Sequence, residues 1–114
     1  MTITPPVVVA DGLDVMVFRT QDDVERFIEP RDVVGGTYRA WDSSGRALRL
    51  DIEHAMCIDL APVALSAMLE PPAWANDLAT TLRAFLAATG ATPPDTATVE
   101  ELVAFTVAFA GYTR

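Results

Sequence analysis

The chain has 114 residues, of which 51% are hydrophobic and 21% charged, a composition typical of one folded domain and not of a disordered chain. Sixteen acidic residues against eight basic ones give a net charge of −8 at pH 7. All eight basic residues are arginines, which excludes catalysis by a lysine Schiff base and a P-loop lysine. The negative charge also argues against nucleic acid as a partner, because phosphates need a basic surface.

Cellular location is predicted from cysteine content and hydropathy. A single cysteine, Cys57, cannot form an internal disulfide, which fits a reducing compartment. The first residues lack the basic region of a signal peptide, and the longest uncharged run, Leu102 to Thr113, has twelve residues. Spanning a bilayer needs roughly 20 apolar residues, so we expect a cytoplasmic protein that does not enter the membrane.

The first half of the chain predicts an extended lead-in, a strand and a helix. Residues 1–12 contain Pro5-Pro6 and Asp11-Gly12 and predict a lead-in, with an edge strand over Val7–Val9 as an option. The apolar run at 15–18 predicts a short buried strand. A helix over about 20–29 follows, because Thr20 is a good N-cap and Pro30 ends the pattern.

A β-hairpin is predicted next, with strands over about 37–41 and 47–53. The four residues between them, Asp42-Ser43-Ser44-Gly45, suit a type I turn followed by a bulge. In the second strand, apolar side chains at Leu48 and Leu50 alternate with charged ones such as Arg49 and Asp51. This alternation predicts one buried and one solvent-facing side.

The second half predicts three helices, over about 60–69, 73–89 and 98–110. The last begins with a capping-box pattern, Thr98 with Glu101, and is apolar on nearly every side, which is typical of a central helix or one shared with another chain. The predicted architecture is α+β, a small antiparallel sheet with the helices packed on one face, forming a single domain over 1–114.

No cofactor, metal or catalytic site is predicted. The only pair of soft ligands is His54 and Cys57, and a zinc site needs three or four ligands. On a strand these two side chains would also point to opposite faces. None of the familiar nucleophile, metalloprotease or dinucleotide motifs occurs. The acidic pairs lie at helix starts or on the outer side of a strand, where each has a structural role. The sequence therefore favours a protein without enzymatic activity.

Acidic residues are concentrated between residues 11 and 53, where ten of them occur. If the first helix and the polar side of the hairpin lie side by side, they form one acidic surface that attracts a basic partner. Strand alternation also allows Trp41 to lie outside as an interface anchor beside this surface. The predicted partner-binding residues are Asp22, Asp23, Glu25, Glu29, Asp32, Trp41, Asp51 and Glu53.

One stretch, 18–50, resembles small bacterial immunity proteins that are encoded beside polymorphic toxins and bind them. The resemblance begins with a strand and an acidic helix. It continues with turn and core residues within 32–38 and within 41–48. The matching residues are Phe27-Ile28-Glu29-Pro30, Asp32-Val33, Gly36-Thr37-Tyr38 and Trp41-Asp42 with Gly45-Arg46 and Leu48. It implies stoichiometric inhibition of a cognate toxin, and acidic members of this class commonly oppose basic nuclease toxins.

The leading hypothesis is therefore a non-enzymatic, acidic binding protein that neutralises a basic toxin domain by direct binding. The alternative is a small structural or regulatory subunit that forms a homodimer through its apolar C-terminal helices. A third hypothesis is a small-ligand pocket between the sheet and the helices, for which the sequence shows no polar constellation.

Overall fold

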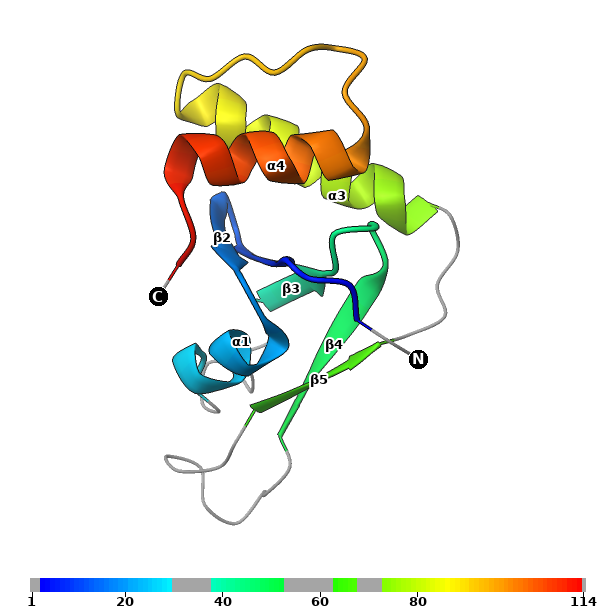
Figure 1. The fold of residues 1–114 in the computed structure, drawn as a ribbon, viewed down its shortest axis with the longest axis vertical. Coiled ribbons are helices and arrows are strands. Elements are labelled where there is room, and N and C mark those ends of the chain that lie inside the picture. Colours follow the sequence, from blue (N-terminus) through cyan, green and yellow to red (C-terminus); the bar gives the residue numbers. More distant parts are fainter. Residues whose placement is uncertain (1–2, 30–37, 53–62, 68–72, 114) are drawn as a thin grey trace.

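The computed structural model describes residues 3–29, 38–52, 63–67 and 73–113. In this part of the chain a five-stranded antiparallel sheet, in the order β2-β1-β3-β4-β5, is packed with three helices (Figure 1). The predicted α+β class is thus confirmed. The elements are β1 (Val7–Asp11), β2 (Asp14–Phe18), α1 (Gln21–Phe27), β3 (Tyr38–Trp41), β4 (Ala47–Ile52), β5 (Val63–Ala67), α3 (Ala73–Ala88) and α4 (Val99–Ala110).

The first strand lies inside the sheet and not at its edge. β1 pairs with β2 on one side and with β3 on the other, and Val7, Val8 and Val9 are fully buried. The prediction of an extended lead-in with an edge strand is therefore wrong. The physical reason is visible in the sequence: an apolar run without alternation is typical of a strand covered on both faces. The edge strand next to β1 is β2 instead.

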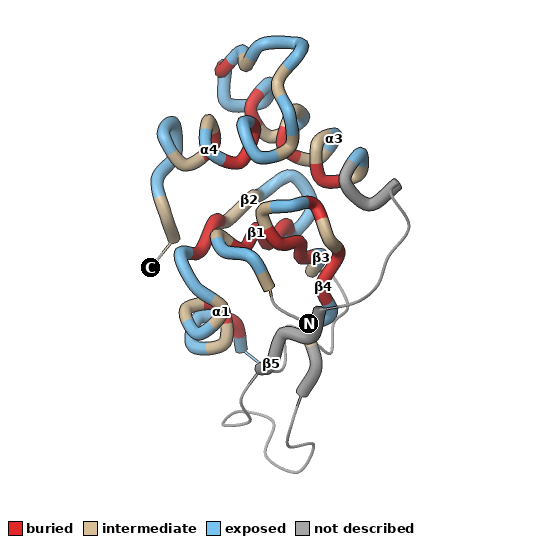
Figure 2. Tube along the Cα trace, turned by 45° about the vertical axis from the view of Figure 1, so that its right-hand side comes forward, coloured by how far each residue is buried: buried red, intermediate tan, exposed pale blue. Residues whose placement is uncertain are grey.

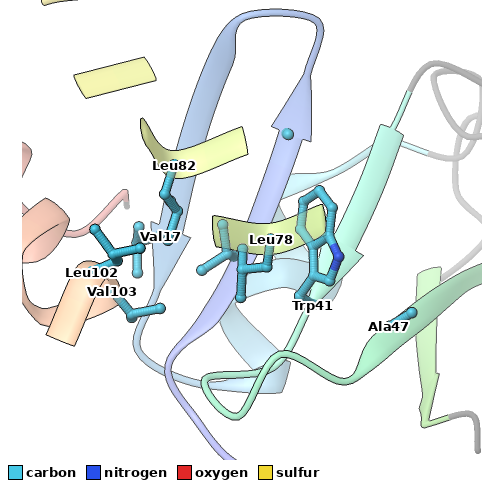
Figure 3. Packing of buried hydrophobic residues seen from close by; sticks show 9 residues of the cluster. Val17, Trp41, Ala47, Leu78, Leu82, Leu102 and Val103 are labelled. Atoms are coloured by element: carbon cyan, nitrogen blue, oxygen red, sulfur yellow. The ribbon is translucent and has the colours of Figure 1, made fainter. Parts of the chain in front are cut away.

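Helices cover both faces of the sheet, which corrects the prediction that they pack on one face. On one face lies α1, which is anchored by Val24 and Ile28, and on the other lie α3 and α4 (Figures 1 and 2). Successive strand residues alternate between these two cores. The core under α1 contains Val7, Val9, Phe18, Val24, Ile28, Ala40 and Leu48. The core under α3 and α4 contains Val8, Ala10, Val17, Trp41, Ala47, Leu78, Leu82, Leu102 and Val103 (Figure 3).

The segment predicted as a helix over 60–69 contains a strand. β5 pairs antiparallel with β4, in a register that places Leu65 opposite Leu50 and Val63 opposite Ile52. A short apolar run has no periodicity that separates a buried strand from a helix, so the pairing with a distant segment decides its structure. The predicted helix is therefore wrong for residues 63–67.

The predicted hairpin is confirmed, and Asp42 holds its turn. Asp42 is fully buried, and its Oδ1 accepts hydrogen bonds from the backbone N–H groups of Ser44 and Arg46, both at 3.0 Å. The Ser44 hydroxyl donates to the same oxygen at 2.6 Å, and Oδ2 accepts from the Thr4 N–H at 3.2 Å. Gly45 closes the turn at φ 89°, a conformation that costs glycine little. One carboxylate thus ties the turn to the segment that enters β1.

Local capping fixes the ends of two helices as predicted. The Thr20 hydroxyl accepts a hydrogen bond from the Asp23 N–H at 3.2 Å at the start of α1. At the start of α4, the Thr98 hydroxyl accepts from the Glu101 N–H at 3.2 Å, and the Glu101 carboxylate accepts from the Thr98 N–H at 2.9 Å. Gly111 caps the other end of α4 at φ 79°. α1 ends at Phe27, two residues earlier than predicted.

Candidate functional site

The acidic residues of α1 divide between two sides of the helix. Val24 and Ile28 face the sheet, so the helical period places Asp22 and Glu25 on one outer side. Asp22 is exposed and Glu25 half-buried. Asp23 turns to the opposite side, where it lines a cavity between α1 and the C-terminal segment. We call Asp22 and Glu25 the acidic side of α1.

Four further acidic residues among the predicted contacts follow α1 in the sequence. Glu29 is exposed and follows the end of α1 by two residues. Asp51 belongs to β4, where it pairs with Ala64 of β5. Asp32 and Glu53 lie outside the described residues.

The described side chains of the hairpin do not join the acidic side of α1 in one surface. Leu48 belongs to the core under α1. Because neighbouring strand residues point to opposite faces, Arg49 faces away from α1. Arg49 and the acidic side of α1 therefore lie on opposite faces of the sheet. Among the described side chains of β4, the acidic side of α1 does not continue onto the hairpin as expected.

Trp41 is a core residue, which rules out the predicted role as an exposed interface anchor. Its relative exposure is 0%, and it packs in the core under α3 beside Leu78 and Ala47 (Figure 3). The prediction failed because the sequence pattern allows one sheet face to be open, whereas α3 and α4 cover the face that Trp41 occupies. Within the described part of the chain, the indole N–H has no hydrogen-bond acceptor.

Glu100 and Glu101 are exposed in the first turn of α4, and beyond them the exposed residues of the helix are apolar. Leu102, Val103 and Thr106 face the sheet and are buried, whereas Phe109 in the last turn is 49% exposed. Two hollows flank the exposed side, of about 380 and 400 Å³, and Ala104 lines both of them. The sequence predicted a helix apolar on nearly every side, and the structure places it at the surface with one side uncovered by the described residues.

Neither a metal centre nor a membrane-spanning helix occurs among residues 3–29, 38–52, 63–67 and 73–113. These residues contain no group of three or more His, Cys, Asp or Glu side chains that could hold a metal ion. Their helices are all too short or too polar to cross a bilayer. His54 and Cys57 lie outside the described residues.

Comparison with known proteins gives no relative from which a function could be transferred. No protein-family model, no curated protein and no solved structure matches the chain. The resemblance to immunity proteins therefore stays a prediction.

Proposed function

We propose that this chain is a non-enzymatic binding protein that neutralises a basic toxin domain by direct binding, in the manner of an immunity protein. The observation that carries the proposal is the acidic side of α1, where Asp22 and Glu25 lie on the outer side of a helix anchored to the sheet by Val24 and Ile28. This contact surface is smaller than the one expected from the sequence, because Trp41 is buried and Arg49 faces away.

The charge of the whole chain favours this kind of partner. At a net charge of −8, the protein attracts a basic domain over long range, and the acidic side of α1 gives that attraction a rigid point of contact. The charges stand on a helix held by two buried side chains, so little conformational entropy is lost when they are engaged. The proposal includes a cytoplasmic location, where a single cysteine stays a thiol.

The test is association kinetics with the basic partner recovered from a lysate of the source organism. The variant Asp22→Lys/Glu25→Lys reverses the acidic side of α1, and Asp11→Lys/Asp14→Lys makes the same change of charge at the exposed turn between β1 and β2. We expect the first variant to slow association by roughly tenfold or more at low salt. The control should slow it much less. Equal slowing by both variants would show that association depends only on net charge, and it would reject α1 as the contact surface.

A second candidate function is self-association through α4, and the exposure of Phe109 favours it. Apolar surface of this kind is costly to leave in water, and burial recovers about 25 cal/mol per Å². Sedimentation equilibrium at protein concentrations from about 1 to about 200 µM would detect a dimer whose dissociation constant is micromolar. Phe109→Glu should abolish the dimer, whereas Phe27→Glu, which charges another exposed phenylalanine, should leave it intact. A wild-type monomer throughout the range would remove this candidate.

A further inference from the structure

A cavity of about 410 Å³ lies between α1 and the segment that follows α4. Its volume falls in the range of about 300–1,000 Å³ that is usual for small-molecule pockets. Two arginines, two aromatic rings, one carboxylate and one small polar side chain line it. These residues are Arg19, Asp23, Arg26, Phe27, Tyr112 and Thr113.

Two contacts of the C-terminal segment fix the walls of this cavity. The Thr113 N–H donates a hydrogen bond of 2.7 Å to the carbonyl oxygen of Val17, on the outer edge of β2. The guanidinium of Arg19 lies over the ring of Tyr112, with Cζ 4.8 Å from the ring centroid. Figure 1 shows the segment descending from α4 past β2 toward α1. The cavity thus has one wall from α1 and one from residues more than eighty positions later.

The charges in the cavity favour an anion. Among the described residues, neither Arg19 nor Arg26 has a carboxylate within ion-pair distance, and Asp23 is the acidic residue that lines the same cavity. Two guanidinium groups and one carboxylate leave a local charge of +1 in a chain whose net charge is −8. Guanidinium groups bind carboxylates through paired, charge-assisted hydrogen bonds.

The rings in the cavity favour an aromatic group. Phe27 is 45% exposed although it packs against Phe18, with ring centroids 5.4 Å apart. Tyr112, from the segment after α4, lines the same cavity. A flat apolar group against these rings would cover the exposed part of Phe27, and aromatic contacts contribute about 0.5–1.5 kcal/mol beyond the area that they bury.

We propose that this cavity binds a small aromatic carboxylate, with the ring against Phe27 and Tyr112 and the carboxylate at Arg26 and Arg19. Asp23 sets the charge of the ligand, because its own carboxylate repels a second negative charge. A singly charged ligand is therefore favoured over a doubly charged one. Arg26 follows Asp22 by one helical turn, so this site adjoins the acidic side of α1, but it does not depend on the proposed binding function.

The experiment is an NMR titration of the ¹⁵N-labelled protein with three matched probes. 3-Phenylpropionate carries both ring and carboxylate, 3-phenylpropionamide carries the ring without the charge, and propionate carries the charge without the ring. We expect saturable shifts of the Phe27 and Thr113 amides and the Arg26 side chain with 3-phenylpropionate only. Equal responses to the amide or to propionate, or no response to any probe, would overturn the proposal.

Variants test which side chains hold the ligand. Arg26→Gln should weaken binding by about tenfold, the loss expected for one charge-assisted hydrogen bond. Arg46→Gln, which removes the same charge at the β3–β4 turn, should leave affinity unchanged. Asp23→Asn should strengthen binding, because it removes a repulsive charge while the Asp23 N–H still bonds to Thr20. The spectrum of each variant reports its fold, so unchanged affinity in folded Arg26→Gln would reject the site.

Discussion

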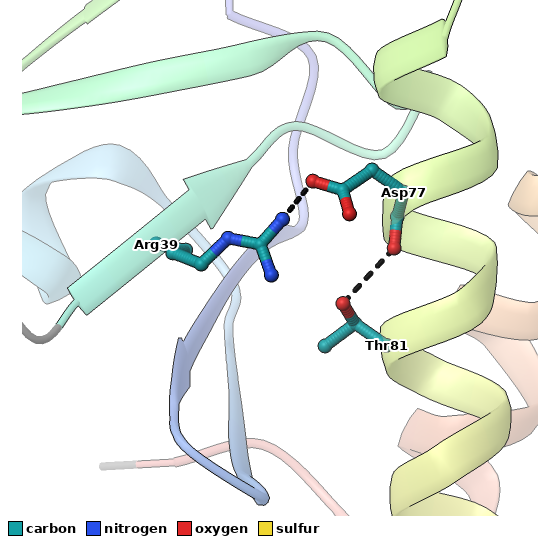
Figure 4. A network of polar contacts seen from close by, with 3 residues as sticks. All are labelled: Arg39, Asp77 and Thr81. Atoms are coloured by element: carbon teal, nitrogen blue, oxygen red, sulfur yellow. Dashed lines mark hydrogen bonds and ion pairs between the residues drawn. The ribbon is translucent and has the colours of Figure 1, made fainter.

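The guanidinium of Arg39 lies over the ring of Trp41, with Cζ 4.9 Å from the ring centroid, and it forms an ion pair with Asp77 of α3 (Figure 4). Arg39 and Trp41 are two residues apart in β3 and share one face of the sheet. The arginine therefore bridges β3 and α3 at the rim of the core that contains the indole. Both side chains of the ion pair are partly exposed, at 53% and 37%, so we assign the stability of this region mainly to the buried ring.

The aromatic ring of Trp41 should be essential for stability, whereas its indole N–H should not be needed. Trp41→Ala is expected to lower the free energy of unfolding by about 3–5 kcal/mol, the usual cost of emptying a large aromatic site. Trp41→Phe should cost much less, because it leaves a smaller cavity and removes a buried N–H whose lack of an acceptor costs about 1–3 kcal/mol. Urea denaturation measures both. Equal losses would show that the indole N–H contributes favourably.

Asp42 should hold the hairpin turn and the entry to β1 together. Asp42→Ala is expected to cost at least about 1.5–3 kcal/mol, the contribution of one hydrogen bond to a charged group, since its carboxylate accepts several. Asp42→Asn keeps one acceptor oxygen but places an amide at the other position, so the contact with Thr4 or with the turn is lost. Amide hydrogen exchange at Thr4 and Ser44 measures both contacts. Unchanged exchange in Asp42→Asn would contradict this role.

The capping box of α4 should make stability depend on pH. The pKa of Glu101 is lowered mainly by the hydrogen bond from the Thr98 backbone N–H and next by the hydrogen bond with the Thr98 side chain. Desolvation raises the pKa, but it is the weakest of the three effects. Because the folded-state pKa lies below the unfolded one, the stabilisation is complete above the unfolded pKa and is lost as pH falls through the folded value. The advantage of wild type over Glu101→Gln should therefore be present at neutral pH and shrink in acid.

The matched control for this prediction is Glu100→Gln, which removes an equal charge from the same helical turn and leaves the capping box intact. The difference between the two variants isolates the hydrogen-bonded carboxylate from the general effect of charge near a helix N-terminus. A difference between Glu101→Gln and wild type that stays constant with pH would contradict the assignment.

Elements whose ends are set by neighbouring residues could be predicted from the sequence. The Thr20 cap, the Asp42 turn and the box formed by Thr98 and Glu101 each depend on contacts within four residues. The places of β1 and β5 in the sheet depend on pairing with distant strands, and an apolar run carries no information about its partner. The same limit explains the wrong prediction of helices on a single face.

The candidate sites were predicted less well than the fold, for a related reason. The sequence grouped Asp22, Asp23 and Glu25 as contacts of one acidic helix, and it could not show that Asp23 lines a cavity. That cavity joins Arg19 to Tyr112, which are far apart in the sequence, so no local motif marks it. Trp41 had two possible faces, and only the position of α3 decides between them.

Binding of a basic protein partner by the acidic side of α1 can be measured directly. The most direct measurement compares capture from a lysate of the source organism by three tagged baits, wild type, Asp22→Lys/Glu25→Lys and Asp11→Lys/Asp14→Lys. We expect one basic, stoichiometric partner that wild type and the Asp11/Asp14 control retain and that elutes as salt rises. The α1 variant should lose this partner. Equal recovery of that partner by all three baits would contradict binding through α1. Recovery of no basic partner by the wild-type bait would contradict it as well.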